Sequence, residues 1–181
     1  MTVSIRTCVA GGAAALAVVA AAFGAVSANA STPAATASRA TVAPGLHTTT
    51  STHLTVDSAA KAAQAALDAA EKDGQRVTVA VVDRNGTTVV TLRGDGAGPQ
   101  SYESAEKKAF TAVAWNAPTS ALVERLAQAP TLKDIPGTLF LAGAVPVAVK
   151  GAPVAGIGVA GAPSGAMDED YARAGLAALT R

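Results

Sequence analysis

The first half of the chain contains the signature of a β-hairpin. Residues 76–83 (RVTVAVVD) and 87–93 (TTVVTLR) are rich in β-branched side chains, which favour extended backbone. Asn85 and Gly86 separate the two runs, and an Asn-Gly pair is typical of the tight turn between antiparallel strands. The two strands must therefore be neighbours in one sheet, and other segments must cover that sheet.

Four helices are predicted around this hairpin from apolar spacing and from capping and breaking residues. They are expected over residues 58–73, 102–115, 119–126 and 168–179. Asp57 and Ser101 are the expected N-caps of the first two, because their short polar side chains can accept a bond from a backbone N–H. The acidic residues at 168–170 are expected in the first turn of the last helix, where the helix dipole favours negative charge.

Three more strands are predicted in the second half, over residues 138–141, 146–150 and 154–160. Together with the hairpin they give an antiparallel sheet of about five strands with helices packed on it, an α/β (α+β) sandwich. Aromatic residues make up only 3% of the chain, whereas Ala, Val and Gly are abundant. We therefore expect small side chains in the core and close contact between helix and sheet.

The N-terminus has the features of a secretory signal. Arg6 precedes an uncharged, Ala-rich run, and the small-residue motif Ala28-Asn29-Ala30 follows it, so we expect cleavage after Ala30 and a secreted, extracellular protein. A retained membrane anchor is the alternative, but a run so rich in Ala and Gly is weakly apolar. The expected organisation is a signal peptide over 1–30, a disordered leader rich in Ser, Thr, Ala and Pro over 31–52, and one domain over 53–181.

The composition excludes several classes of function. Removal of Arg6 with the signal leaves equal numbers of acidic and basic residues, so no nucleic-acid partner and no direct membrane insertion are expected. The only cysteine, Cys8, lies in the signal, so the mature domain has neither disulfide nor thiolate metal site. The only histidines, His47 and His53, lie at or before the edge of the domain, so no catalytic residues are predicted.

Several sequence blocks in one order resemble the GlcG/HbpS family, most closely its secreted actinobacterial haem-binding branch. The resemblance covers residues from about 54 to 179. It is based on five blocks: VTVAVVDRNG, LRGD, SYESAEKKAFTA, LKDIPGTLFLAG, and GIGVAGAPSG with the following DEDYARAGL. The sequence departs from many relatives at Gly143-Ala144-Val145-Pro146, where they have a Gly-Gly pair before the proline.

The resemblance implies a profilin-like sandwich that assembles into a homo-octamer and binds haem and iron. The secreted branch is similar to an accessory sensor of haem or oxidative stress, acting on the extracellular part of a membrane histidine kinase in a two-component system. We therefore expect a binding and redox-sensing protein rather than an enzyme. Two alternatives remain: an enzyme of this fold that degrades haem or protects against peroxide, and a structural oligomer whose metal binding is incidental.

Glu103 and Glu106 form an E-x-x-E pair on the predicted second helix. Residues three apart lie on one helix face, where two carboxylates can share an iron ion. Iron-binding relatives have such a motif at this helix, so the resemblance implies a metal site here. The alternative is a solvated face, because Glu103 can also pair with Lys107 one turn away.

The resemblance also implies a haem-binding residue. A threonine after the Ile-Pro-Gly turn is associated with haem in the secreted branch, and Thr138 is the matching residue. His53 is the other candidate ligand, and Lys108 is a candidate partner for a haem propionate. In the alternative interpretation, Thr138 is an ordinary strand residue, His53 belongs to the leader and Lys108 is a solvated lysine.

Overall fold

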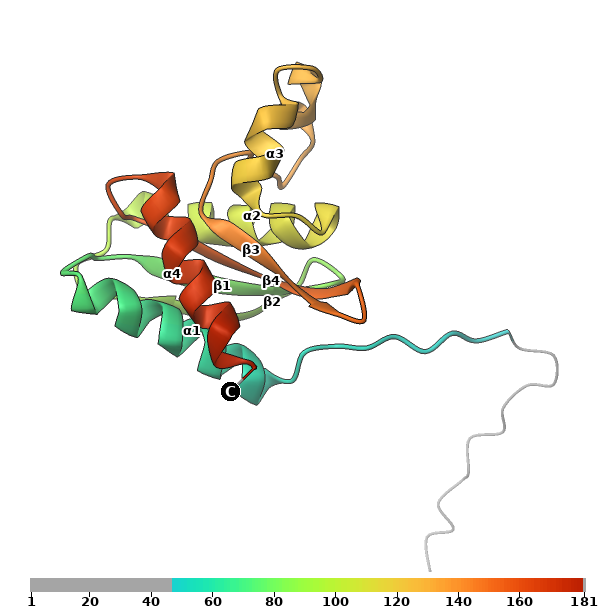
Figure 1. Ribbon diagram of the computed structural model, residues 1–181, viewed down its shortest axis with the longest axis horizontal. Helices are drawn as coiled ribbons and strands as arrows, with labels where there is room; N and C mark the ends of the chain where they lie inside the picture. Colours follow the sequence, from blue (N-terminus) through green and yellow to red (C-terminus); the bar gives the residue numbers. More distant parts are fainter. Residues whose placement is uncertain (1–46, 181) are drawn as a thin grey trace, which may run out of the picture. The chain divides into compact units, whose positions relative to one another are not determined.

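An antiparallel sheet lies between two layers of helices in the computed structural model, which describes residues 47–180 (Figure 1). The strands are β1 (Thr78–Asp83), β2 (Thr88–Arg93), β3 (Ala144–Val149) and β4 (Ala152–Ala160). Their order across the sheet is β2-β1-β4-β3, and every neighbouring pair is antiparallel. The predicted hairpin is confirmed as β1 and β2, joined at Asn85 and Gly86.

Helices cover both faces of the sheet. On one face lie α1 (Val56–Lys72) and α4 (Gly165–Ala178), and on the other lies α2 (Pro99–Trp115). A short helix, α3 (Thr119–Arg125), and a 3-10 turn, η1 (Pro130–Asp134), project from this body (Figure 1). The α/β sandwich predicted from the sequence is therefore confirmed.

The predicted signal peptide over 1–30 and most of the predicted leader lie outside the described residues. The last leader residues, 47–52, form neither helix nor strand. Between residues 47 and 180, no helix has the length and apolarity needed to cross a bilayer.

Successive side chains of β1 pack alternately against the helices on the two faces of the sheet. Val79 and Val81 pack in the cluster that contains the alanines of α1 together with Tyr171 and Ala172 of α4. Ala80 contacts Ala105 of α2, and Val82 packs against other residues of the same helix. Because successive strand residues point to opposite faces, a strand covered on both faces must be apolar throughout, as the run VAVV is.

Two glycines of β4 allow α2 to lie directly on the sheet. A Cβ atom built on Gly156 would lie 2.2 Å from the carbonyl oxygen of Ala109, and one on Gly158 would lie 2.2 Å from that of Ala105. Neither position has room for any side chain. The close contact expected from the small-residue composition is thus made between helix backbone and strand backbone.

The strand predicted over 138–141 is not formed, so the sheet has four strands rather than about five. Gly137 has a left-handed backbone (φ 79°) and turns the chain, and the N–H of Thr138 donates to the Ile135 oxygen at 3.3 Å. The N–H of Leu139 donates to Thr111 Oγ1 at 2.8 Å. Because a turn and a helix side chain take these donors, they cannot join a strand ladder.

Two predicted N-caps are also wrong. Thr55 rather than Asp57 caps α1, since its hydroxyl accepts the N–H of Ser58 at 3.2 Å. Gly98 precedes α2, and Pro99 occupies the first helical position, where a missing N–H is harmless. The Ser101 hydroxyl instead donates to the Gly98 oxygen at 2.6 Å from inside the first turn.

We predict that Gly158→Ala destabilises the protein by about 3 kcal/mol or more, because the added methyl group would overlap the backbone of α2. The control is Gly74→Ala, where the methyl group meets no atom within 4 Å. There the left-handed backbone costs about 1–2 kcal/mol. Urea unfolding of both variants measures the difference, and equal losses would contradict the close contact between α2 and β4.

Candidate functional site

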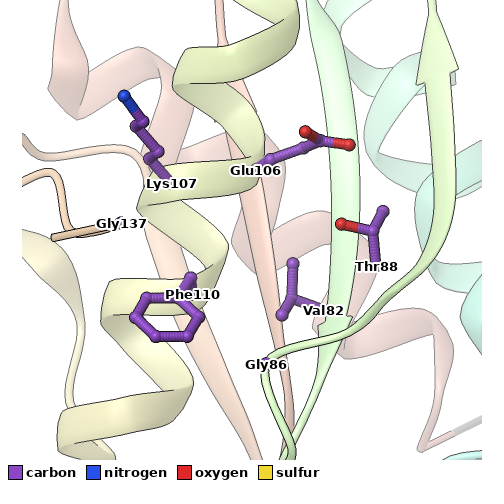
Figure 2. Close-up of a pocket in the computed structure, with 7 residues that line it drawn as sticks. All are labelled: Val82, Gly86, Thr88, Glu106, Lys107, Phe110 and Gly137. Atoms are coloured by element: carbon purple, nitrogen blue, oxygen red, sulfur yellow. The ribbon is translucent and has the colours of Figure 1, made fainter.

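A hollow of about 260 Å³ lies between α2 and the β1–β2 hairpin (Figure 2). We call it the hairpin hollow, and its lining residues come from the hairpin, from α2 and from the loop before β3. They are Val82, Gly86, Thr88, Glu106, Lys107, Phe110 and Gly137. Its volume is slightly below the range of about 300–1,000 Å³ typical of pockets that enclose a ligand. A large flat ligand would therefore be covered on one side only.

Glu106 points across the hairpin hollow toward the strand that carries Thr88 (Figure 2). Its Oε1 accepts a hydrogen bond from the Thr91 hydroxyl of β2 at 3.1 Å. This bond joins α2 to the edge strand and orients the carboxylate, which keeps further acceptor capacity for a ligand.

Glu103, the other member of the predicted metal pair, lies on the solvated surface of α2. Its side chain is 73% exposed, and Lys107 Nζ lies 2.6 Å from its Oε1. The hydrogen bond from Lys107 lowers the pKa of the Glu103 carboxyl below its usual value. The structure thus gives the two glutamates different partners, Lys107 for Glu103 and Thr91 for Glu106.

Residues 47–180 contain no group of three or more His, Cys, Asp or Glu side chains placed to hold a metal ion. An ion held by Glu103 and Glu106 would complete its coordination with water or with another molecule.

Thr138 is the residue after Gly137, which lines the hairpin hollow. Its hydroxyl donates to the Ile135 oxygen at 2.7 Å, which closes the turn over Ile135–Thr138. The hydroxyl oxygen retains acceptor capacity toward a ligand. The fold therefore brings the turn of Thr138 and the carboxylate of Glu106 to one hollow, although 32 residues separate them in sequence.

Lys108, the predicted partner for a haem propionate, is buried, so the alternative interpretation of it as a solvated lysine is wrong. It is 2% exposed, and its Nζ donates to Asp168 Oδ2 at 2.8 Å and to the Val159 oxygen at 3.1 Å. Burial raises the pKa of the Asp168 carboxyl, and the bond from Lys108 lowers it by less. Its amine thus forms a buried ion pair between α2 and α4, whereas Glu103 and Lys107 of the same helix form an exposed pair.

Helical spacing indicates this burial. Ser101, Ala105, Lys108 and Ala112 recur at intervals of three and four residues, so they form one stripe of α2, and all four are buried. The acidic residues at 168–170 have a matching role that the sequence analysis missed. Two of the three are buried, Asp168 beside Lys108 and Glu169 beside Ser120, whose N–H and hydroxyl both donate to its carboxylate.

His53 lies on the other face of the sheet from the hairpin hollow. Its Nδ1 is 3.8 Å from Asp83 Oδ2, and its Nε2 is 2.8 Å from the Ser51 hydroxyl. Val82 lines the hollow, and the next residue, Asp83, points to the opposite face because strand side chains alternate. The structure does not bring His53 together with Thr138 or Glu106 in this hollow.

The arrangement suits a flat ligand with an apolar surface and polar edges. Phe110 offers an apolar ring, and Glu106 and Thr88 offer polar groups, whereas the amine of Lys107 points away from them (Figure 2). None of the lining residues is a His, Cys, Met or Tyr, the usual axial ligands of haem iron. The lining offers oxygen atoms from Glu106 and Thr88, and the hydroxyl of Thr138 belongs to the residue that follows the lining residue Gly137.

These features define an α/β sandwich with an open hollow against α2. Residues 54–177 match the model of the family described as "Haem degrading protein HbpS-like". The match spans more than half of the chain, so the chain belongs to the HbpS-like family.

Solved structures show the same relationship. HbpS is 77% identical, with a TM-score of 0.74, and the match covers 76% of this chain and 97% of that chain. A Streptomyces reticuli HbpS variant, in which two glutamates three positions apart are replaced by aspartate, is 74% identical, with a TM-score of 0.74 and coverage of 78% and 97%. A complex of PduOC with haem is 28% identical, with a TM-score of 0.64 and coverage of 70% and 95%. The comparison with curated proteins gives no match.

We predict that Lys108→Met destabilises the protein by about 3–5 kcal/mol, because it leaves the buried Asp168 carboxylate without its cation. Lys107→Met on the same helix is the matched control. It removes only a surface pair, so a change within about 0.5 kcal/mol is expected. Urea midpoints measure both, and similar midpoints for the two variants would show that the ion pair is not a structural anchor.

Proposed function

We propose that this protein binds haem at the hairpin hollow, with the turn of Thr138 at its rim. The match of residues 54–177 to a haem-related family carries the proposal. The 28% identical relative solved in complex with haem supports it further.

The hollow fits part of the haem group. The Phe110 ring can lie against the porphyrin, and the Thr138 hydroxyl supplies an oxygen ligand beside it. Lys107 is the cation that lines the hollow, so it replaces Lys108 as the partner for a propionate. A neutral hydroxyl is a weak iron ligand and the hollow is open, so binding is weak on one chain or is completed by a second chain. Bound haem would supply a redox-active iron.

We further propose that Glu103 and Glu106 bind iron. They have the residue type and the spacing of the two glutamates that were replaced in the matched Streptomyces reticuli HbpS variant. Glu103 is well exposed and Glu106 half-buried, so an ion can approach from solvent once Glu103 leaves Lys107.

The wider role follows from the resemblance and from the N-terminal sequence. The mature protein is proposed to be secreted and to form a homo-oligomer, with an octamer as the expected size. It is further proposed to act as an accessory sensor of haem or redox state for a membrane histidine kinase. In this role haem or iron occupancy would alter the surface presented to the kinase.

The family description favours a second function, the degradation of haem. The two functions differ in turnover. Incubation of the pure protein with haem and a reductant distinguishes them, because an enzyme produces biliverdin and free iron over many cycles, whereas a sensor retains the haem.

We predict that Thr138→Ala and Thr138→Val both weaken haem binding and change the Soret band, since both remove the hydroxyl. Thr138→Ser keeps the hydroxyl and is expected to bind as the natural protein does. His53→Ala is included as the competing ligand. Normal binding by the Ala and Val variants, with loss in His53→Ala, would refute the assignment of Thr138.

We predict that Glu103→Ala combined with Glu106→Ala lowers iron uptake while the fold is kept, because Ala is well tolerated on a helix surface. Equilibrium dialysis with ferrous or ferric iron measures uptake, and circular dichroism checks the fold. The control is Glu124→Ala, another exposed glutamate on a helix. Unchanged uptake in the double variant would return the pair to a solvated surface role.

A further inference from the structure

We infer that Thr111 is the positioning residue of the haem site, an inference that rests on the proposed function. Its buried hydroxyl attaches the turn of Thr138 to α2 and so sets the place of that turn beside the hairpin hollow.

The hydroxyl of Thr111 connects two backbone groups. Thr111 is 0% exposed. Its Oγ1 accepts the N–H of Leu139 at 2.8 Å and donates to the Lys107 oxygen, one turn earlier in α2, at 2.7 Å. Because the donor bond fixes the direction of the hydroxyl hydrogen, a lone pair is directed to Leu139. The loop is therefore bonded to the helix turn that carries Glu106 and Lys107.

The other polar bonds of the turn stay within it. The N–H and the hydroxyl of Thr138 both donate to the Ile135 oxygen, so they shape the turn but do not reach α2. Within residues 135–140 of the described structure, the hydrogen bond from Leu139 to Thr111 is the one that reaches α2.

Apolar contacts lie on either side of this bond. The Phe110 ring lies beside Gly137, and a Cβ atom there would be 3.8 Å from Phe110 Cε1. Phe140 meets Trp115 edge-on, with ring centroids 5.2 Å apart. Such contacts hold the segment against the helix but permit sliding, because they are not directional. The hydrogen bond fixes the position along the helix, and thereby the distance of Thr138 from Glu106.

The loss of the hydroxyl should therefore act on the site more than on the fold. In Thr111→Val the shape is kept, but the Leu139 N–H loses its partner and has to turn toward water. The apolar contacts at both ends keep the segment on the protein, while Thr138 moves relative to the hollow.

Thr119 provides a matched control. It is also 0% exposed, and its Oγ1 accepts a backbone N–H, that of Ala144 at 2.9 Å. This bond holds the start of β3, and Thr119 does not line the hairpin hollow. Thr119→Val thus removes an equivalent buried bond without touching the turn of Thr138.

The experiment compares the natural protein with Thr111→Val, Thr111→Ser and Thr119→Val in haem titrations followed in the Soret band. Thr111→Val is expected to bind roughly tenfold more weakly, the effect of one lost buried hydrogen bond. Thr111→Ser restores the hydroxyl and should bind normally, and Thr119→Val should bind normally despite a similar fall in melting temperature. Thr111→Ala, which adds no bulk, replaces the Val variant if that variant does not fold.

Amide hydrogen exchange of the haem-free protein gives a second readout. Exchange at Leu139 should accelerate in Thr111→Val and not in Thr119→Val. Normal haem affinity in Thr111→Val, or an equal loss in Thr119→Val, overturns the inference while the proposed function stands. Failure of the natural protein to take up haem refutes the proposed function. In that case hydrogen exchange still tests the bond, because an unchanged exchange rate at Leu139 in Thr111→Val would show that Thr111 does not hold the turn.

Discussion

The rest of the structure depends on the contact between α2 and β4. Gly156 and Gly158 leave no room for a side chain, so the carbonyl groups of Ala105 and Ala109 lie directly on the strand. Because of this contact α2 covers most of its face of the sheet. It packs mainly on β4, β1 and β3 and only slightly on β2. At such a short separation, Lys108 can reach the Val159 oxygen in the sheet below it. Larger residues at either glycine would move the helix and everything that it carries.

The buried pair of Lys108 and Asp168 specifies how the two helical layers meet. Desolvation of both charges opposes folding, so a pair of this kind adds little net stability compared with an apolar pair, whereas the loss of one partner is severe. The pair instead orients α4, because the Lys108 amine can bond Asp168 only when this part of α4 lies beside it. Asp168 also accepts the Ala162 N–H at 3.0 Å, and Glu169 binds Ser120, so the first turn of α4 fixes the loop before it and α3 as well.

Local signals predicted much of the fold. The hairpin was predictable because its strands and turn are specified by neighbouring residues, and the separation of α2 from α3 agrees with Pro118 between them, a residue that cannot continue a helix. The strand expected over 138–141 failed because Thr111, which is 28 residues from Leu139, takes its N–H. Helical spacing indicates the burial of Lys108, but it could not identify Asp168 as its partner, which is 60 residues away. The propensities of neighbouring residues do not identify hydrogen-bond partners that are 28 or 60 residues apart in the chain. Helical spacing and family resemblance indicated the two glutamates, and the resemblance indicated Thr138. The fold was needed to show that Glu106 and Gly137, the neighbour of Thr138, line one hollow.

Helix α2 contributes both to the core and to the candidate site, so the position of the site depends on the packing of the core. The inner stripe of α2 meets the sheet through small side chains, and its outer side carries Glu106, Lys107 and Phe110 to the hollow. Thr111 stands between them: it is fully buried, yet its hydroxyl holds the loop of Thr138. A shift of α2 over β4 would move the two sides of the hollow unequally, because Thr88 and Gly86 belong to the hairpin and stay with the sheet. The geometry of this open hollow thus depends on the backbone contact between α2 and β4 more than on contacts among the residues that line it.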